Sequence, residues 1–220
     1  MAINMKKRIH KDERLQQILR TAAALFHKNG YAQTTTRQIA QACGISQSNL
    51  YYYVKSKEDF FDLFVKMTTG TFEEYDEEIR SQLPGISGTE ALKRKIRQGL
   101  TLIDSIQDMM LFWYRESGTM GHGHLDQLIK QEFKSNELIR NVIEAGCKAG
   151  EFKVEDPALA AYQILMLEHM WILKRWHLRE HYTLEDYIRH CQAAALALVH
   201  ADESSDITAS NRRLKQSRRL

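Results

Sequence analysis

The sequence predicts an all-α protein with two helical domains, a small one at the N-terminus and a larger one after it. Only two prolines occur in 220 residues, Pro84 and Pro157, whereas a β-rich chain of this length would need more turn-forming residues. Apolar residues recur at the spacing of three and four that marks one face of a helix. Capping residues precede several of these stretches, so that helix starts can be placed along the chain.

Charge divides the chain into four predicted segments. Residues 1–10 form a short basic arm, 11–57 the N-terminal domain, 58–200 the larger domain and 201–220 a flexible basic tail. The net charge is +8 over residues 1–57, −7 over 58–200 and +2 over the tail. A basic first quarter suits a polyanion such as DNA, and an acidic remainder does not, so composition alone assigns different tasks to the two domains.

The N-terminal domain carries the pattern of a helix-turn-helix. A first helix over apolar positions from Leu15 to Phe26 ends at Gly30, as a left-handed cap would end it. Thr35 or Thr36 then caps a short helix that turns Ile39 and Ala40 inward. Gly44 supplies a turn that commonly needs positive φ, and Ser46 caps a second short helix that carries Leu50 and Val54 inward.

The outward side of that second helix is polar and uncharged. It presents amides, hydroxyls and three consecutive tyrosines: Gln47, Ser48, Asn49, Tyr51, Tyr52 and Tyr53. Amides pair with base edges, and tyrosine hydroxyls reach phosphate oxygens. Arg37, Lys55 and Lys57 lie beside it in the sequence. The residues predicted to contact DNA are therefore Thr36, Arg37, Gln47, Ser48, Asn49, Tyr51, Tyr52, Tyr53, Lys55 and Lys57.

This segment closely resembles the DNA-binding domain of the TetR family of bacterial repressors. The matching stretches are Thr35-Thr36-Arg37, Ile39-Ala40, Cys43-Gly44-Ile45, Leu50-Tyr51-Tyr52-Tyr53-Val54 and Lys55-Ser56-Lys57, in register. The resemblance is sharp over about residues 10–65 and only architectural beyond them. Two alternatives read the same residues differently: an amphipathic hairpin whose tyrosines are half-buried packing, and a helical adaptor whose helix-turn-helix contacts protein instead of DNA.

The larger domain is predicted from helix-start signals and apolar runs. Capping boxes are expected at three helix starts: Ser56 with Asp59, Ser87 with Glu90, and Thr183 with Asp186. The first opens a long helix that ends near Ile79. Asp156 and Pro157 open another helix, which has two apolar faces. The run Met109–Tyr114 is apolar on every side, so it must be buried all round or line a cavity.

Several function classes find no support in the sequence. No apolar run is long enough to cross a bilayer and no signal peptide is recognisable, so we expect a cytoplasmic protein without membrane partners. The three cysteines are widely spaced without a CxxC pair, and they read as small buried hydrophobes. His122 and His124 alone are a weak pattern for a metal, so no metal site is predicted. No catalytic residues are predicted, because neither a GxSxG elbow nor an HExxH motif is present.

The family resemblance implies about nine helices, a homodimer built on the last two long helices, and a pocket for a small-molecule effector. The dimer helices would be residues 157–178 and 184–199. The larger domain also resembles the acyl-CoA-responsive branch of the family, in Phe112–Arg115, Glu144–Phe152, Trp171–Trp176 and Tyr182–Leu184. No cofactor is expected beyond the effector, which would be an acyl-CoA or another largely apolar carboxylic metabolite. The residues predicted to bind it are Met110, Trp113, Tyr114, Arg115, Met166, Met170, Trp171 and Arg175.

The predicted regulator would release a palindromic operator when its effector binds. The helix from Ser56 to about Ile79 begins beside the DNA and ends in the larger domain, so it is the element expected to carry the signal. Ordinary packing remains the alternative role for Trp113, Trp171 and Trp176.

Overall fold

The protein is a helical molecule in which one long helix lies across the end of a bundle. The computed structural model describes residues 2–82, 85–118 and 122–200, so the predicted tail 201–220 lies outside the described residues. Ten helices and no strand occur in these ranges. They are α1 (Ala2–Asn29), α2 (Thr36–Ala42), α3 (Gln47–Tyr51), α4 (Asp59–Gln82), α5 (Gly88–Ser105), α6 (Gln107–Glu116), α7 (His122–Lys148), α8 (Pro157–Leu173), α9 (Arg175–His181) and α10 (Leu184–Val199).

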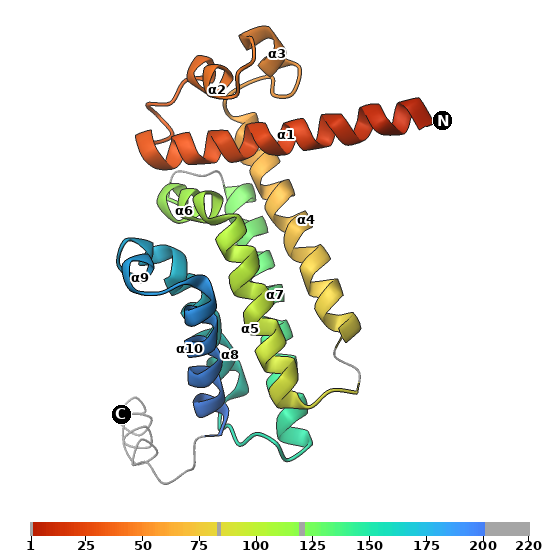
Figure 1. The fold of residues 1–220 in the computed structure, drawn as a ribbon, viewed down its shortest axis with the longest axis vertical. Helices are drawn as coiled ribbons and strands as arrows, with labels where there is room; N and C mark the ends of the chain where they lie inside the picture. The colour runs from red at the N-terminus through yellow and green to blue at the C-terminus, as the bar shows by residue number, and fades with distance from the viewer. Residues whose placement is uncertain (1, 83–84, 119–121, 201–220) are drawn as a thin grey trace, which may run out of the picture.

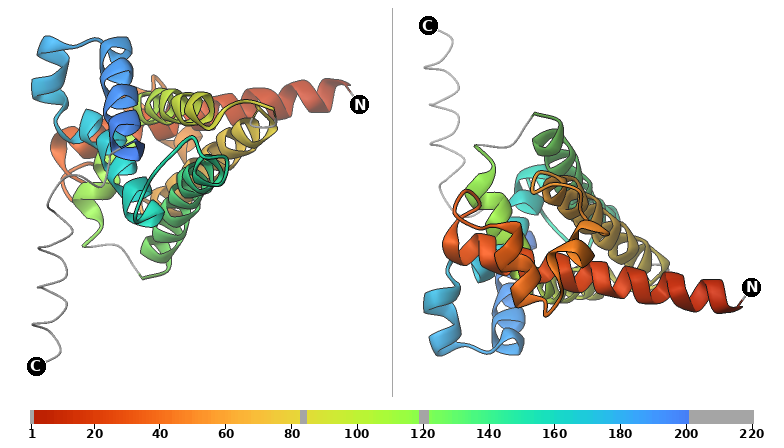
Figure 2. Two further views of the ribbon diagram at one scale, coloured as in Figure 1. Left: turned by 90° about the horizontal axis from the view of Figure 1, so that it is seen from below. Right: turned by 90° about the horizontal axis from the view of Figure 1, so that it is seen from above.

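The first three helices form a head above the bundle. Figure 1 shows α1 lying crosswise, with α2 and α3 on its far side and α4 running down from the head along one edge of the body. In Figure 2 the N-terminal end of α1 extends beyond the rest of the molecule. The body is formed by α5 to α10, and α5, α7 and α8 pack against one another at its centre.

Most predicted helix starts are confirmed by the caps. Asp156 Oδ1 accepts a hydrogen bond from the Leu159 amide at 2.9 Å, with Pro157 at the first helical position. Thr183 and Asp186 form the predicted capping box of α10. At α5 only half of the predicted box is present: Ser87 Oγ accepts from the Glu90 amide, whereas the Glu90 carboxylate accepts from Arg94.

Three predicted boundaries were wrong. Helix α1 begins at Ala2 and not at Lys11, since no glycine or proline interrupts residues 2–10. The helix that starts after Ser87 ends at Ile106 and does not continue through the apolar run to Tyr114, and the helix predicted over 157–178 is divided at Lys174. Both residues leave the helical region, with φ of −116° and −114°. Neither break has a glycine or proline beside it, so the local sequence carries no signal for it.

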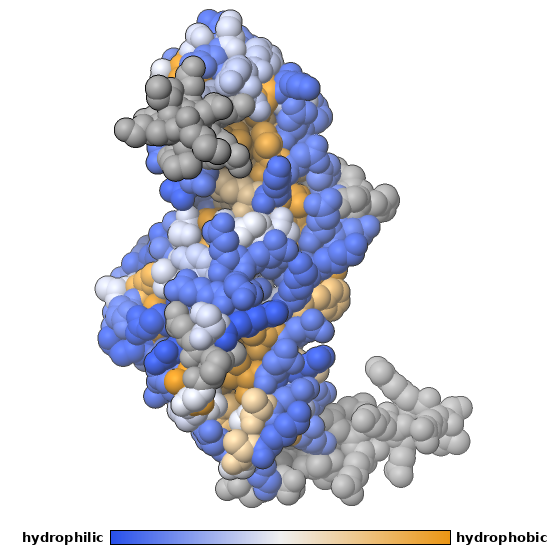
Figure 3. All heavy atoms as spheres, turned by 90° about the vertical axis from the view of Figure 1, so that its right-hand side faces the viewer, coloured by the Kyte–Doolittle hydropathy of each residue, from blue (hydrophilic) through white to orange (hydrophobic). Residues whose placement is uncertain are grey.

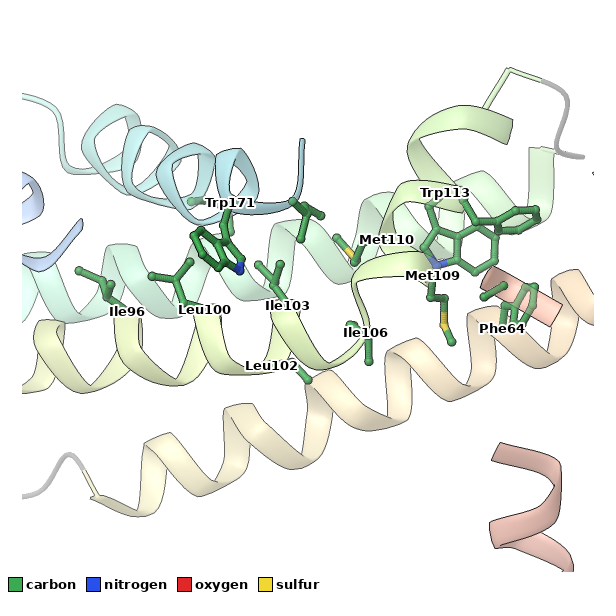
Figure 4. Close-up of a cluster of buried hydrophobic side chains, with 14 of the residues drawn as sticks. Phe64, Ile96, Leu100, Leu102, Ile103, Ile106, Met109, Met110, Trp113 and Trp171 are labelled. Atoms are coloured by element: carbon green, nitrogen blue, oxygen red, sulfur yellow. The ribbon is translucent and has the colours of Figure 1, made fainter. Parts of the chain in front are cut away.

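A single hydrophobic core runs from the head into the body. Figure 4 shows its middle part, where Phe64 of α4 meets Trp113 of α6, and where Trp171 of α8 lies beside the α5 residues Leu100 and Ile103. The face along α4 is mostly hydrophilic, with apolar side chains visible in patches between the hydrophilic ones (Figure 3). The outer side of α4 therefore offers little apolar surface to a partner.

Candidate nucleic-acid interface and ligand cavity

Local hydrogen bonds fix the two short helices of the head. Thr35 is the cap of α2: its hydroxyl accepts from the Gln38 amide, and Gln38 Oε1 accepts from the Thr35 amide at 2.8 Å. Ser46 Oγ caps α3 through the Asn49 amide at 3.1 Å. Gly44 has φ of +65°, so the turn uses a conformation that side chains other than glycine rarely adopt. These contacts confirm the helix-turn-helix geometry predicted from the sequence.

The polar side of α3 is open to solvent. Gln47, Ser48 and Asn49 are exposed, as are Tyr51 and Tyr52, whereas Tyr53 is half-buried against the core. Exposed amides at the N-terminal end of a helix are the groups that helix-turn-helix proteins present to base edges. The three tyrosines therefore differ in exposure. Only Tyr53 fits the alternative in which the tyrosines are half-buried packing residues.

Tyr51 belongs to a small network that joins α2 to α3. Its hydroxyl lies 3.3 Å from Thr36 Oγ1, and Gln47 Nε2 donates to both hydroxyls at 3.5 Å. The hydrogen bond with Thr36, followed by that from Gln47, lowers the pKa of Tyr51. Because Gln47 and Tyr51 are held by Thr36, all three present a common polar surface before any ligand arrives.

The basic residues around α3 are not equivalent. Arg37 and Lys55 are exposed. Lys57 is half-buried: its ammonium lies 4.3 Å from the centre of the Tyr31 ring and donates to the Ala32 carbonyl at 3.2 Å. Partial burial lowers the pKa of Lys57. Part of the hydrogen-bonding capacity of Lys57 is thus used inside the head, which makes Lys55 the simpler test of a phosphate contact.

Replacing Lys55 by alanine should weaken binding to every DNA sequence, because a phosphate contact carries no sequence information. The slope of log affinity against log salt concentration should fall by about one unit. Gln47→Ala should instead change which operator is preferred, since an amide that pairs with a base edge discriminates by about 1–3 kcal/mol. Binding isotherms on operator and random DNA at several salt concentrations separate the two. Equal losses of Gln47→Ala on both DNAs would contradict a base contact.

The start of α4 is fixed beside the head by Asp59. Its carboxylate accepts from the backbone amides of Lys55 at 2.7 Å and Ser56 at 3.1 Å, and Ser56 Oγ accepts from the Asp59 amide. These amide donors, that of Lys55 foremost, lower the pKa of Asp59. The capping box predicted from the sequence is therefore confirmed, and it ties the loop that carries Lys55 to α4.

Helix α6, like α4, connects the body to the head, and it does so through direct contacts with α1. Phe112, fully buried, lies with its ring centre 5.4 Å from that of Phe26 in α1 and 5.3 Å from that of Phe64 in α4. On the same helix, Arg115 Nη1 donates to the His27 carbonyl of α1 at 2.9 Å. Cationic donors at the last carbonyls of a helix are favourable because those oxygens lack partners within the helix. The end of α1 is thereby held by a side chain of the body.

The body contains a cavity of about 220 Å³ between α4, α5, α6, α7 and α8. Much of its wall is apolar, with Phe72, Ile103, Met110, Trp113, Leu125, Leu128, Ile129 and Leu165. The polar residues of the wall are Thr68, Lys95, Tyr114, Ser117, Gln131, Glu132, Ser135, Glu168 and His169. An engineered cavity of about 150 Å³ holds benzene, so this one has room for a group slightly larger than such a ring.

Ionisable side chains in this wall are deeply buried. Glu168, on α8, is 1% exposed, and a Cβ atom at Gly99 of α5 would lie 2.3 Å from its Oε2, so the glycine makes room for the carboxyl group. Burial raises the pKa of Glu168 to about 7, although Lys95 acts in the opposite direction. Burial lowers the pKa of the neighbouring His169, whose Nδ1 is hydrogen-bonded to the Tyr114 hydroxyl.

The raised pKa of Glu168 predicts a pH dependence of stability. In the unfolded chain this carboxyl ionises near its ordinary pKa, so between about pH 4.5 and 7 the folded state holds the extra proton. The free energy of unfolding should therefore fall as pH rises through this window, by up to about 1.4 kcal/mol per unit. Urea unfolding at pH 5 and 7.5 should show a smaller loss for Glu168→Gln than for the wild type. His169 is common to both proteins, so identical pH profiles would contradict the assignment.

Three predicted effector residues lie on the cavity wall, namely Met110, Trp113 and Tyr114. The other five lie elsewhere, so their predicted positions need correction. Trp171 is buried against Tyr187, with Nε1 donating to Asp104 at 2.8 Å, and Arg175 bridges Gln107 and Asp108. Arg115 faces α1, as described above. Met166 and Met170 point to the outside of α8, each 38% exposed.

Sequence reasoning missed most of the polar wall, including Lys95, Gln131 and Ser135. Glu168 and His169 received no predicted role from the sequence either. A usable signal was present, because they are a charged and a titratable residue in the middle of an otherwise apolar helix.

An exposed apolar stripe runs along α8. It consists of Leu159, Tyr162, Met166, Met170 and Leu173, which we call the α8 stripe. Their spacing of three and four places them on one side of the helix. On the neighbouring α10, Ala193, Ala194 and Ala197 are exposed as well. Large apolar side chains beside small ones form a surface against which another helix can approach closely.

Within residues 2–82, 85–118 and 122–200, no group of three or more histidine, cysteine or acidic side chains is placed to hold a metal, and His124 Nε2 lies 2.6 Å from Asp62 Oδ1. None of the helices in these ranges is both long and apolar enough to span a membrane.

The fold and the two sites define a helix-turn-helix regulator with a ligand cavity in a separate helical domain. The model of the bacterial regulatory proteins of the tetR family matches residues 18–63, and that of the tetracyclin repressor-like C-terminal domain matches 85–180. The HTH-type transcriptional regulator HbdR of Aromatoleum sp. (strain CIB) is 30% identical over 179 residues, 80% of this chain and 76% of HbdR. The chain therefore belongs to the TetR family.

Solved structures confirm the fold. A regulatory protein of the family from Rhodococcus RHA1 is 21% identical and covers 86% of this chain and 98% of its own, with a TM-score of 0.72. AibR, crystallised in complex with isovaleryl coenzyme A and operator DNA, is 20% identical over 84% of this chain and 97% of its own, with a TM-score of 0.64. As a TetR-family regulator, the protein binds operator DNA, dimerises and responds to a small-molecule effector.

Proposed function

We propose that this protein is a repressor that leaves a roughly palindromic operator when an acyl-CoA thioester fills the cavity of its body. The observation that carries this is the position of α6, which lines the cavity with Met110, Trp113 and Tyr114 and contacts the head through Phe112 and Arg115. It acts in the cytoplasm and catalyses no reaction. Membership of the TetR family and the basic head disfavour an adaptor role. A protein that contacts only other proteins has no need for a net charge of +8 in its first 57 residues.

The effector class is supported by cavity size and wall chemistry. A volume of about 220 Å³ accommodates a short acyl group but not a whole coenzyme A, which would remain outside. Methionine and aromatic side chains suit such a group because they adapt to irregular apolar shapes. AibR, which has the same fold, is bound to a five-carbon acyl thioester in its crystal structure. Another apolar carboxylic metabolite of similar size is the alternative.

Signal transfer in this proposal runs through α6 together with α4. The sequence pointed to α4 alone, but α6 packs along α1 and holds its C-terminal end through Arg115. A ligand that displaces Trp113 also acts on Thr68 of α4, whose Oγ1 accepts from Trp113 Nε1 at 3.3 Å. Rotation of the head by either helix changes the separation of the two recognition helices, which must match successive major grooves about 34 Å apart.

Calorimetric titration of a panel of CoA esters, with and without bound operator, tests the proposal. By linkage, an ester that weakens operator binding a hundredfold must itself bind a hundredfold more weakly to the DNA complex, a coupling of about 2.7 kcal/mol. If no ester binds, the acyl-CoA assignment is wrong while the place in the family stands. If operator leaves ester affinity unchanged, the cavity does not control DNA binding.

A further inference from the structure

Three residues of the cavity wall carry buried polar atoms without hydrogen-bond partners. These atoms are Oε1 and Nε2 of Gln131, Oγ of Ser135 and Oε1 of Glu168. Gln131 and Ser135 are each 4% exposed and lie one turn apart on the same side of α7, which packs against the α8 that carries Glu168. Lys95, 5% exposed, is close enough to affect the ionisation of Glu168 and His169.

Such atoms are costly in a folded protein. A buried donor or acceptor without a partner destabilises by about 1–3 kcal/mol, and native proteins contain few of them. Here three residues with this defect line one cavity. An apolar acyl chain would leave all four atoms unpaired, whereas a ligand with a polar group at this place would satisfy several at once.

The mixture of donors and acceptors restricts the polar group. Glu168 Oε1, when ionised, and Gln131 Oε1 accept hydrogen bonds, whereas Gln131 Nε2 and the Lys95 ammonium donate them. Once ionised, Glu168 would repel a second carboxylate, whereas Lys95 would repel an ammonium group. An uncharged hydroxyl meets both needs, since one oxygen donates and accepts.

We propose that the effector carries a hydroxyl group on its acyl portion, and that Gln131, Ser135 and Glu168 bind it inside the cavity. This inference rests on the acyl-CoA function proposed above. It restricts the effector from acyl-CoA thioesters in general to those whose acyl group carries a hydroxyl.

Two thioesters of the same length, 3-hydroxybutanoyl-CoA and butanoyl-CoA, provide the direct test. In calorimetry the hydroxylated ester should bind at least about tenfold more tightly, because it pairs atoms that the plain ester leaves unpaired. The double variant Gln131→Leu, Ser135→Ala should lose this preference or reverse it. Equal affinity of the wild type for both esters would overturn the hydroxyl assignment and leave the acyl-CoA proposal intact.

A second measurement does not depend on coenzyme A. Ser135→Ala removes a hydroxyl without a partner, so the melting temperature of the ligand-free protein should stay the same or rise. The matched control is Thr68→Val, because Thr68 is equally buried but has Met109 and Trp113 as partners, and it should lower the melting temperature. A loss at Ser135 as large as that at Thr68 would show that Ser135 is already paired, which overturns the proposal.

If neither thioester binds, the acyl-CoA assignment fails and the hydroxyl assignment is decided by smaller probes. Cyclohexanol and methylcyclohexane have similar shapes and differ in the hydroxyl group. Cyclohexanol should raise the melting temperature of the wild type more than methylcyclohexane does, and the double variant should abolish the difference. The opposite order in the wild type would overturn the proposal.

Discussion

Met166→Lys combined with Met170→Lys should convert the dimer into a folded monomer that has lost most of its affinity for the operator. Both residues belong to the α8 stripe, and each is 38% exposed in the single chain, so the charges cost little before association. In a two-fold dimer built on this stripe, each substitution occurs twice at the interface, and four ammonium groups would face apolar surface. Burying an unpaired charge costs far more than a methionine contact contributes.

The effect on DNA binding follows from the loss of the second head. Two linked heads bind more tightly than one by about 10²–10⁴-fold, so operator affinity should fall by a factor in that range. Light scattering gives the oligomeric state and fluorescence anisotropy gives the affinity. Glu77→Lys, on the exposed face of α4, is the control and should remain dimeric. A dimer that survives the double substitution would place the interface elsewhere.

Two positions on α10 differ in their value as probes of the same interface. Ala194 is exposed, so Ala194→Glu is a valid second probe of the same interface. Leu198 is half-buried against the core of its own chain, and a charge there would disturb the monomer as well. A monomeric Leu198 variant would therefore not distinguish an interface from a damaged fold.

Phe112→Ala should be the most destabilising single substitution at the junction of head and body. The ring is fully buried, with its centre 5.3 Å from those of Phe61, Phe64 and Trp113. Removing a buried phenylalanine costs about 3–5 kcal/mol, since contacts are lost and a cavity remains. For a chain of this size the melting temperature should fall by roughly 10 °C. Calorimetry on Phe133→Ala gives the control, because Phe133 is 59% exposed.

The same variant reports on signal transfer. With the ring removed, α6 loses its main apolar contact with α1, so the coupling between effector and operator binding should weaken even where the protein remains folded. An unchanged coupling energy in Phe112→Ala, measured well below its melting temperature, would show that α4 alone carries the signal.

The sequence predicted the head better than the cavity, because the determinants of the head are local. A cap such as Ser46, a turn at Gly44 and the pair Ser56 and Asp59 act within four residues of one another. The roles of the exposed side chains of α3 in reading DNA stay predictions.

The cavity depends on contacts between helices that lie far apart in the sequence. Helix α8 has two apolar sides, and nothing local tells which one faces the interior. The sequence therefore placed Met166 and Met170 at the effector, whereas the structure exposes both on the outside of α8. The same uncertainty hid Glu168, whose place depends on a glycine in α5. Short-range sequence patterns therefore locate the helices. Which side of a helix faces the interior depends on its packing against other helices.

The shortness of α3 limits how much sequence information one head can collect. A helix from Gln47 to Tyr51 offers three or four side chains to the groove, which distinguish about as many base pairs. Two heads then specify about seven base pairs. A genome offers at least roughly 10⁶ competing sites, so a sequence of about seven specified base pairs occurs many times by chance. The operator must therefore also be selected by the ease with which its unread centre bends or twists. Base pairs that no side chain touches should carry part of the regulator's discrimination.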